Sequence, residues 1–115
     1  MAVEEVERAA AVIARAFEAD PLTVYLLPDG AERAAKARLM FTALTRYDQL
    51  FGQVDRADGF EAVATWLGPE HGEETPERLN EAGFDRLHEQ VGRACLERLG
   101  AFYAVVEEAH RQAVP

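Results

Sequence analysis

The chain has 115 residues, which leaves room for one domain, residues 1–115. Its net charge is −9, so its surface repels nucleic acids and anionic membranes. Its composition, 49% hydrophobic and 29% charged, is typical of a folded protein. A single cysteine excludes an intrachain disulfide, and there is neither a signal-peptide pattern nor an apolar run of about 18 residues. These features predict a cytoplasmic protein with no nucleic acid and no membrane among its partners.

The first predicted element is an amphipathic helix that runs to about Ala19. Its apolar residues recur at steps of three and four, which places them on one face: Val3, Val6, Ala10, Ile13 and Phe17. Asp20-Pro21 ends this helix, because the residue before a proline is disfavoured in helical geometry. A short turn over residues 22–27 follows.

The second predicted helix begins after Asp29, whose side chain is expected to accept a hydrogen bond from the amide of Glu32. It ends at Gly52. Its core-facing positions are predicted to be Ala37, Met40, Phe41, Leu44, Tyr47 and Phe51.

A β-hairpin is predicted around Asp58-Gly59, the preferred dipeptide of a two-residue turn. That turn predicts three pairs, Ala57 with Phe60, Arg56 with Glu61 as an ion pair, and Val54 with Val63. The second strand, residues 60–67, has apolar side chains on both faces and is therefore predicted to be an interior strand.

Thr75-Pro76 is a strong helix start, and the short helix that it opens is predicted to close at Gly83. Apolar residues from Phe84 to Ala109 then predict one long amphipathic helix, with Gly100 as the place for a kink. The predicted fold is therefore α+β and helix-dominated, with about four helices and one β-hairpin.

Several of these stretches resemble a known family. AFEADP (residues 16–21) and YLLPD (25–29) are similar to the opening of a bacterial subfamily of GNAT-type N-acetyltransferases, and residues 58–69 resemble its central strands. The tail EEAH (107–110) is similar to the helix end that precedes the cofactor-binding strand. The resemblance covers nearly the whole chain and implies the N-terminal half of a GNAT fold.

The resemblance does not extend to the acetyl-CoA site. In that family, acetyl-CoA is held by a strand, a loop of the form Gln/Arg-x-x-Gly-x-Gly/Ala and the following helix, whose amides bind the pyrophosphate. Residues 89–96 resemble the loop superficially, but Glu89 would repel a phosphate and no strand precedes it. The resemblance therefore implies an acetyltransferase-like protein that retains the acceptor-substrate side. Alone it binds no cofactor and is not competent in acetyl transfer, and a separate chain supplying the other half would restore transfer to an amine.

The same resemblance assigns four residues to the acceptor-substrate pocket: Phe17, Asp20, Tyr25 and Trp66. The alternative is that the three aromatic residues are core residues and that Asp20 caps the turn at Pro21. No catalytic residue is identified. His71 with Glu70, Glu73 and Glu74 lacks the spacing of a metal site, so no metal is expected. Cys95 lies on an apolar stripe and is expected to be a buried, inert thiol.

A second hypothesis from a different class is a non-catalytic helical module that binds a partner protein or a small apolar ligand. For either function, the strand from Phe60 to Leu67 has no charge after Glu61 and no proline, so nothing protects its edge from pairing. A two-fold homodimer is the expected result.

Overall fold

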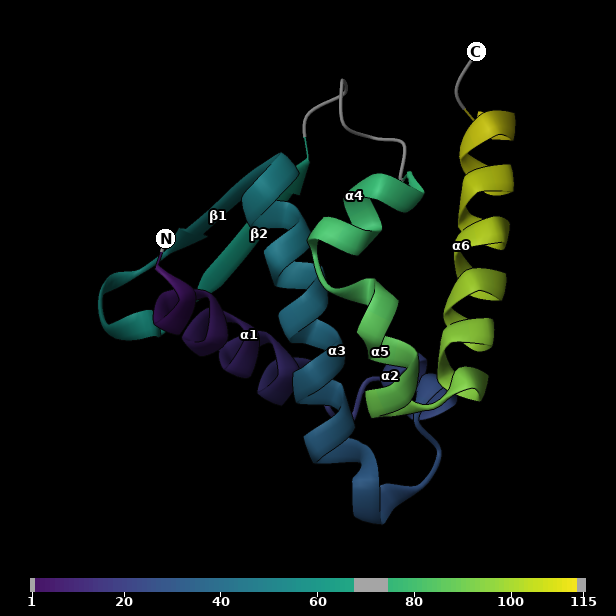
Figure 1. Ribbon diagram of the computed structural model, residues 1–115, viewed down its shortest axis with the longest axis horizontal. Helices are drawn as coiled ribbons and strands as arrows, with labels where there is room; N and C mark the ends of the chain where they lie inside the picture. The colour runs from purple at the N-terminus through teal and green to yellow at the C-terminus, as the bar shows by residue number, and fades with distance from the viewer. Residues whose placement is uncertain (1, 68–74, 114–115) are drawn as a thin grey trace.

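The computed structural model describes residues 2–67 and 75–113. These residues form six α-helices and one two-stranded antiparallel sheet, so the α+β, helix-dominated class is confirmed. The helices are α1 (Val3–Phe17), α2 (Pro21–Leu26), α3 (Gly30–Phe51), α4 (Pro76–Glu81), α5 (Phe84–Val91) and α6 (Arg93–Ala113). The strands are β1 (Gly52–Arg56) and β2 (Val63–Leu67), joined through the 3-10 turn η1 (Asp58–Phe60). In Figure 1, α3 runs through the middle, with α1 and the hairpin on one side and α4, α5 and α6 on the other.

The helix starts follow the capping signals in the sequence. Asp29 caps α3, although its side chain accepts from the amide of Ala31 at 3.0 Å instead of that of Glu32. Thr75 caps α4 by accepting from the amide of Arg78 at 3.2 Å. These side-chain oxygens satisfy amide donors that the first turn of a helix leaves without partners.

Two helices were not predicted as separate elements. The turn at residues 22–27 is a helix, because Asp20 caps it and Pro21 occupies its first position, where a missing amide costs nothing. The long C-terminal helix breaks at Gly92, whose φ of 93° and ψ of 149° are incompatible with a helix. Gly100, where a kink is predicted, lies within the continuous helix α6.

The predicted hairpin register is also wrong. The observed Cα partners are Val54 with Thr65 and Arg56 with Val63, and Ala57 donates to the carbonyl of Ala62 at 3.0 Å. The pairing is displaced by two residues, so every side chain keeps the face that the alternation assigns to it. Arg56 does not pair with Glu61 across the strands as predicted. Its Nε lies 3.4 Å from Oε2 of Glu5 in α1.

The hairpin loop is wider than a two-residue turn because Phe60 turns inward. Phe60 is 7% exposed, packs with Ala9 and Val54, and has the guanidinium groups of Arg8 and Arg56 at 4.3 and 4.6 Å from its ring centroid. Its φ of 59° costs about 1–2 kcal/mol for a residue other than glycine. Burying a phenylalanine gains about 1.5–3 kcal/mol, so burial outweighs the local preference.

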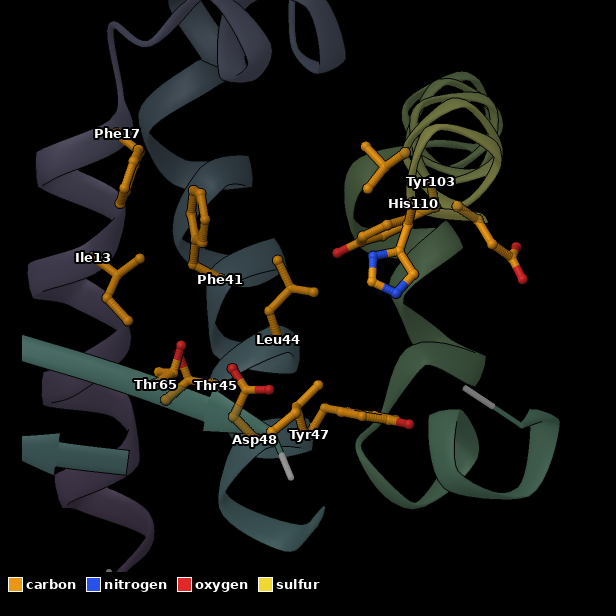
Figure 2. A pocket seen from close by; sticks show the side chains of 13 residues that line it. Ile13, Phe17, Phe41, Leu44, Thr45, Tyr47, Asp48, Thr65, Tyr103 and His110 are labelled. Carbon is orange, nitrogen blue, oxygen red and sulfur yellow. The ribbon is translucent and has the colours of Figure 1, made fainter. Parts of the chain in front are cut away.

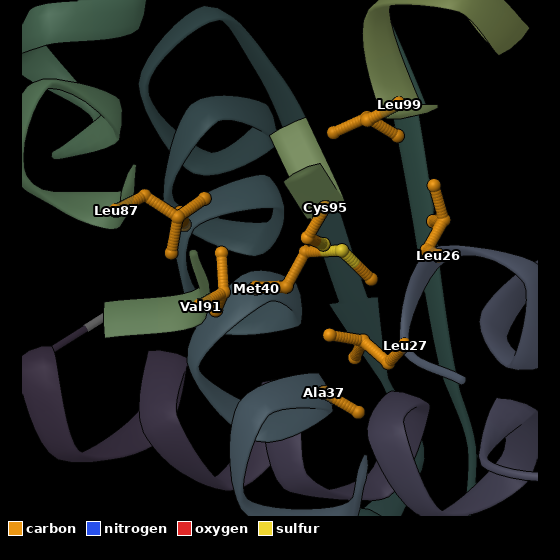
Figure 3. Packing of buried hydrophobic residues seen from close by; sticks show 9 residues of the cluster. Leu26, Leu27, Ala37, Met40, Leu87, Val91, Cys95 and Leu99 are labelled. Carbon is orange, nitrogen blue, oxygen red and sulfur yellow. The ribbon is translucent and has the colours of Figure 1, made fainter. Parts of the chain in front are cut away.

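The main hydrophobic core lies where α2, α3, α5 and α6 meet (Figure 3). Its buried members are Leu26, Leu27, Ala37, Met40, Ala43, Leu87, Val91, Cys95 and Leu99. Cys95 is buried as predicted, and burial raises the pKa of its thiol. Arg33 and Arg98 stabilise the end of α2 by donating to the carbonyls of Leu27 and Leu26.

The second half of α6 projects beyond this core. Past Leu99, each described residue of α6 is exposed except the half-buried Phe102, and Val105 and Val106 are 69% and 45% exposed. Burial of this half of the apolar stripe, as predicted, is therefore not observed. Among residues 2–67 and 75–113, no helix combines the length and the apolar character needed to span a membrane.

Candidate functional site

An open cleft of about 760 Å³ separates α1, α3 and β2 from the second half of α6. This volume is within the range of small-molecule sites. In Figure 2, Ile13, Phe17 and Phe41 form one apolar wall, and Tyr103 and His110 of α6 face it from the far side. The rings of Phe17 and Phe41 are stacked with centroids 6.0 Å apart. The cleft lining is completed by Leu44, Thr45, Tyr47, Asp48, Thr65, Leu67, Val106 and Glu107.

Asp48 is the acidic group on the α3 side of the cleft. Its carboxyl group is half-buried and lies close enough to the side chain of Thr65 on β2 for the two to interact. Burial raises the pKa of Asp48, and the interaction with Thr65 partly offsets this effect. The carboxylate is therefore costly to keep charged here, and a cation beside it would lower that cost.

Tyr47 lines the cleft but is almost entirely buried. The residue is 3% exposed, its ring contacts that of Phe51 at 5.0 Å, and its hydroxyl has no hydrogen-bond partner among the described residues. A buried hydroxyl without a partner costs about 1–3 kcal/mol. The Tyr47 hydroxyl is therefore a cost to folding within the described residues and not a group that a ligand in the cleft can reach.

The free edge of β2 borders the same cleft. In the described residues β2 pairs with β1 alone, and Figure 2 shows β1 on one side of it and Ile13, Phe17 and Phe41 beyond the other. Antiparallel strands alternate between pairs that exchange both hydrogen bonds and pairs that exchange none. Since Ala57 bonds to Ala62, the amides and carbonyls of Ala64 and Trp66 point to β1, and those of Val63, Thr65 and Leu67 point to the free edge.

β2 is also more exposed than predicted. An interior strand would be covered on both faces, but residues 64–67 are all exposed in this structure. Trp66 is 60% exposed and lies on the outer face, where its Nε1 donates to Oδ2 of Asp55 at 3.2 Å. The prediction of an interior strand is therefore wrong for the described residues, and β2 is an edge strand.

The four residues assigned to an acceptor pocket by the resemblance do not converge. Phe17 lines the cleft and is 47% exposed, whereas Trp66 lies on the opposite face of the hairpin. Tyr25 is 49% exposed on α2 and is not part of the cleft lining. Asp20 caps α2 by accepting from the amide of Leu22 at 3.0 Å. The alternative that these aromatic residues form the core does not hold either, since none of the three is buried.

The sequence reasoning did not identify Asp48, Thr65, Tyr103 or His110 as site residues. Asp48 follows Leu44 by four residues on an otherwise apolar helix face, and a charged residue in that position is a detectable signal. Tyr103, Val106 and His110 are three and four residues apart, so they share one face of α6. Thr65 keeps the same face in the predicted and the observed register, but its position beside Asp48 depends on how β2 packs against α3, which local sequence does not determine.

No group of three or more His, Cys, Asp or Glu side chains in the described ranges is arranged to hold a metal ion. The candidate around His71 lies outside the described residues. Comparisons with protein-family models, curated proteins and solved structures find no match to the chain. The resemblance to GNAT-type acetyltransferases therefore remains a prediction from the sequence.

Proposed function

We propose that this protein is a binding module that takes up an extended polypeptide segment along the free edge of β2. The observation that supports this most directly is the position of that edge, which runs beside the apolar wall of the cleft. An added strand would pair with the outward amides and carbonyls of Val63, Thr65 and Leu67. Its inward side chains would cover Ile13, Phe17 and Phe41, which no described residue covers fully.

A proline at the edge of β2 tests this function. The probe is a fluorescein-labelled nine-residue peptide in which valine alternates with threonine, measured by fluorescence anisotropy. Thr65→Pro removes an outward amide and introduces a ring at the edge, so we expect it to weaken binding about tenfold or more. Thr65→Val is the matched control, because it also loses the hydroxyl that contacts Asp48 but keeps the amide.

The outcome depends on the difference between the two variants. Far-ultraviolet circular dichroism and the urea midpoint show that both are folded, since proline is tolerated at an edge position whose amide is not part of the ladder. Equal affinity of the two variants for the peptide, or no binding to the unmodified protein, would rule out the β2 edge as the docking site.

A second candidate is the acetyltransferase-like function that the resemblance implies. It is favoured by one observation, namely that Phe17, within the AFEADP stretch, lines the cleft. In that case the segment taken up on β2 belongs to the half that holds acetyl-CoA, and the complex transfers the acetyl group to an amine. The separate chain predicted from the sequence is then the natural binding partner.

For this candidate we expect no measurable binding of acetyl-CoA to the chain alone. The residues that would cradle a pyrophosphate are not recognisable in the sequence, and the net charge of −9 opposes a ligand with several phosphate charges. Isothermal titration calorimetry measures this directly. A 1:1 complex with a dissociation constant in the low micromolar range would show that the cofactor site is in the present residues.

A further inference from the structure

The charged groups that line the cleft are acidic on both sides. Asp48 lies on the α3 wall and Glu107 on the α6 wall, and no lysine or arginine lines the cleft among the described residues. Three more titratable residues line the same cleft: His110 and Tyr103 on the α6 side, and Tyr47 on α3. An apolar cleft of this kind is complementary to a ligand that carries both apolar and cationic groups.

The register of the hairpin places Asp48 relative to an added strand. Thr65 has its amide and carbonyl at the free edge, and its side chain faces the helices and lies beside Asp48. A residue directly opposite Thr65 on a new strand projects its side chain to the same face, about 5 Å from that of Thr65. The long side chain of a lysine or arginine at that position therefore reaches the Asp48 carboxylate.

We propose that the segment bound at the β2 edge comes from a separate polypeptide and carries a lysine or arginine opposite Thr65, which pairs with Asp48. This inference rests on the proposed function and adds the chemistry of the partner to it. The apolar wall contacts the side chains two positions before and two positions after that basic residue, which share its face of the strand, and Glu107 adds to the negative potential across the cleft. The backbone of β2 sets the extended conformation of the segment.

Two features favour a separate segment over a second copy of this chain. Each copy carries a net charge of −9, so two copies repel one another. In addition, antiparallel pairing of β2 with its own copy requires a two-fold axis perpendicular to the sheet, which places both helical layers on the same face. The α1 and α3 walls extend past the β2 edge, so the two layers would compete for the same space.

Three peptides of the nine-residue design test the basic position. They carry norleucine, lysine or glutamate in place of the central valine and are otherwise identical. We expect the lysine peptide to bind the unmodified protein at least fivefold more tightly than the norleucine peptide, and the glutamate peptide to bind most weakly. Asp48→Asn should abolish the preference for lysine over norleucine. Glu89→Gln removes one negative charge from an exposed site on α5 and should leave the preference unchanged.

The result separates this inference from the proposed function. Binding of the norleucine peptide with no gain from lysine would overturn the basic position but leave the β2 edge as a docking site. Binding of none of the three peptides would overturn both. Sedimentation equilibrium of the chain alone tests the predicted homodimer: a dimer that Thr65→Pro converts to a 12.7 kDa monomer would assign the edge to a second copy and overturn the separate partner.

Discussion

Leu87→Ala is expected to lower the free energy of unfolding by about 2–5 kcal/mol. Leu87 is 1% exposed and belongs to the core cluster in which α5 packs against α3. Truncation removes contacts with neighbours that include Met40 and Val91, and close-packed surroundings relax only in part to fill the space. The loss is a large fraction of the stability of a typical small domain, which is about 5–15 kcal/mol in total. Urea denaturation followed by circular dichroism measures it.

Leu50→Ala is the matched control for this substitution. It removes the same atoms from a helix, but Leu50 is 48% exposed near the end of α3. We expect its effect to be less than about 1 kcal/mol. Similar shifts of the urea midpoint for Leu50→Ala and Leu87→Ala would contradict the position of the core between α3 and α5.

The helix starts were predictable from the sequence because their determinants are local. Asp20, Asp29 and Thr75 act within three residues of themselves, and proline follows Asp20 and Thr75 directly. The division between α5 and α6 was not predictable from apolar spacing, because Leu87, Val91 and Cys95 continue one periodic pattern across the break. The break depends on the backbone of Gly92, which a periodicity analysis does not detect.

The hairpin and the cleft show why tertiary contacts limit such predictions. Asp58-Gly59 favours a two-residue turn locally, but Phe60 gains more by packing against α1 than the turn gains by its shape. Likewise, the apolar positions Phe102 and Val106 predict a buried helix face, whereas the structure leaves this half of α6 on the far side of a cleft. Leu44 and Leu99 lie on equally clear stripes, yet Leu99 is buried and Leu44 lines the cleft.

Gly52→Ala is expected to destabilise the protein by about 2–3 kcal/mol, in the upper part of the range for overpacking. Gly52 joins α3 to β1, and a Cβ atom there would lie 1.9 Å from the carbonyl oxygen of Trp66. Because the obstructing atom belongs to the backbone of β2, the strands must move apart to accommodate a methyl group. The substitution thus weakens the sheet whose free edge borders the cleft, and peptide binding should weaken together with stability.

Gly100→Ala is the same chemical change as Gly52→Ala, but it is expected to stabilise the protein. Gly100 lies within α6, is exposed, and has no atom within 4 Å of the position of a Cβ. A helix gains about 0.5–1 kcal/mol when an interior glycine becomes alanine, since the unfolded chain loses conformational freedom and nothing clashes in the folded one. Thermal unfolding should therefore show a lower midpoint temperature for Gly52→Ala and a higher one for Gly100→Ala. A loss of stability in Gly100→Ala would contradict the open space that surrounds a Cβ atom at Gly100.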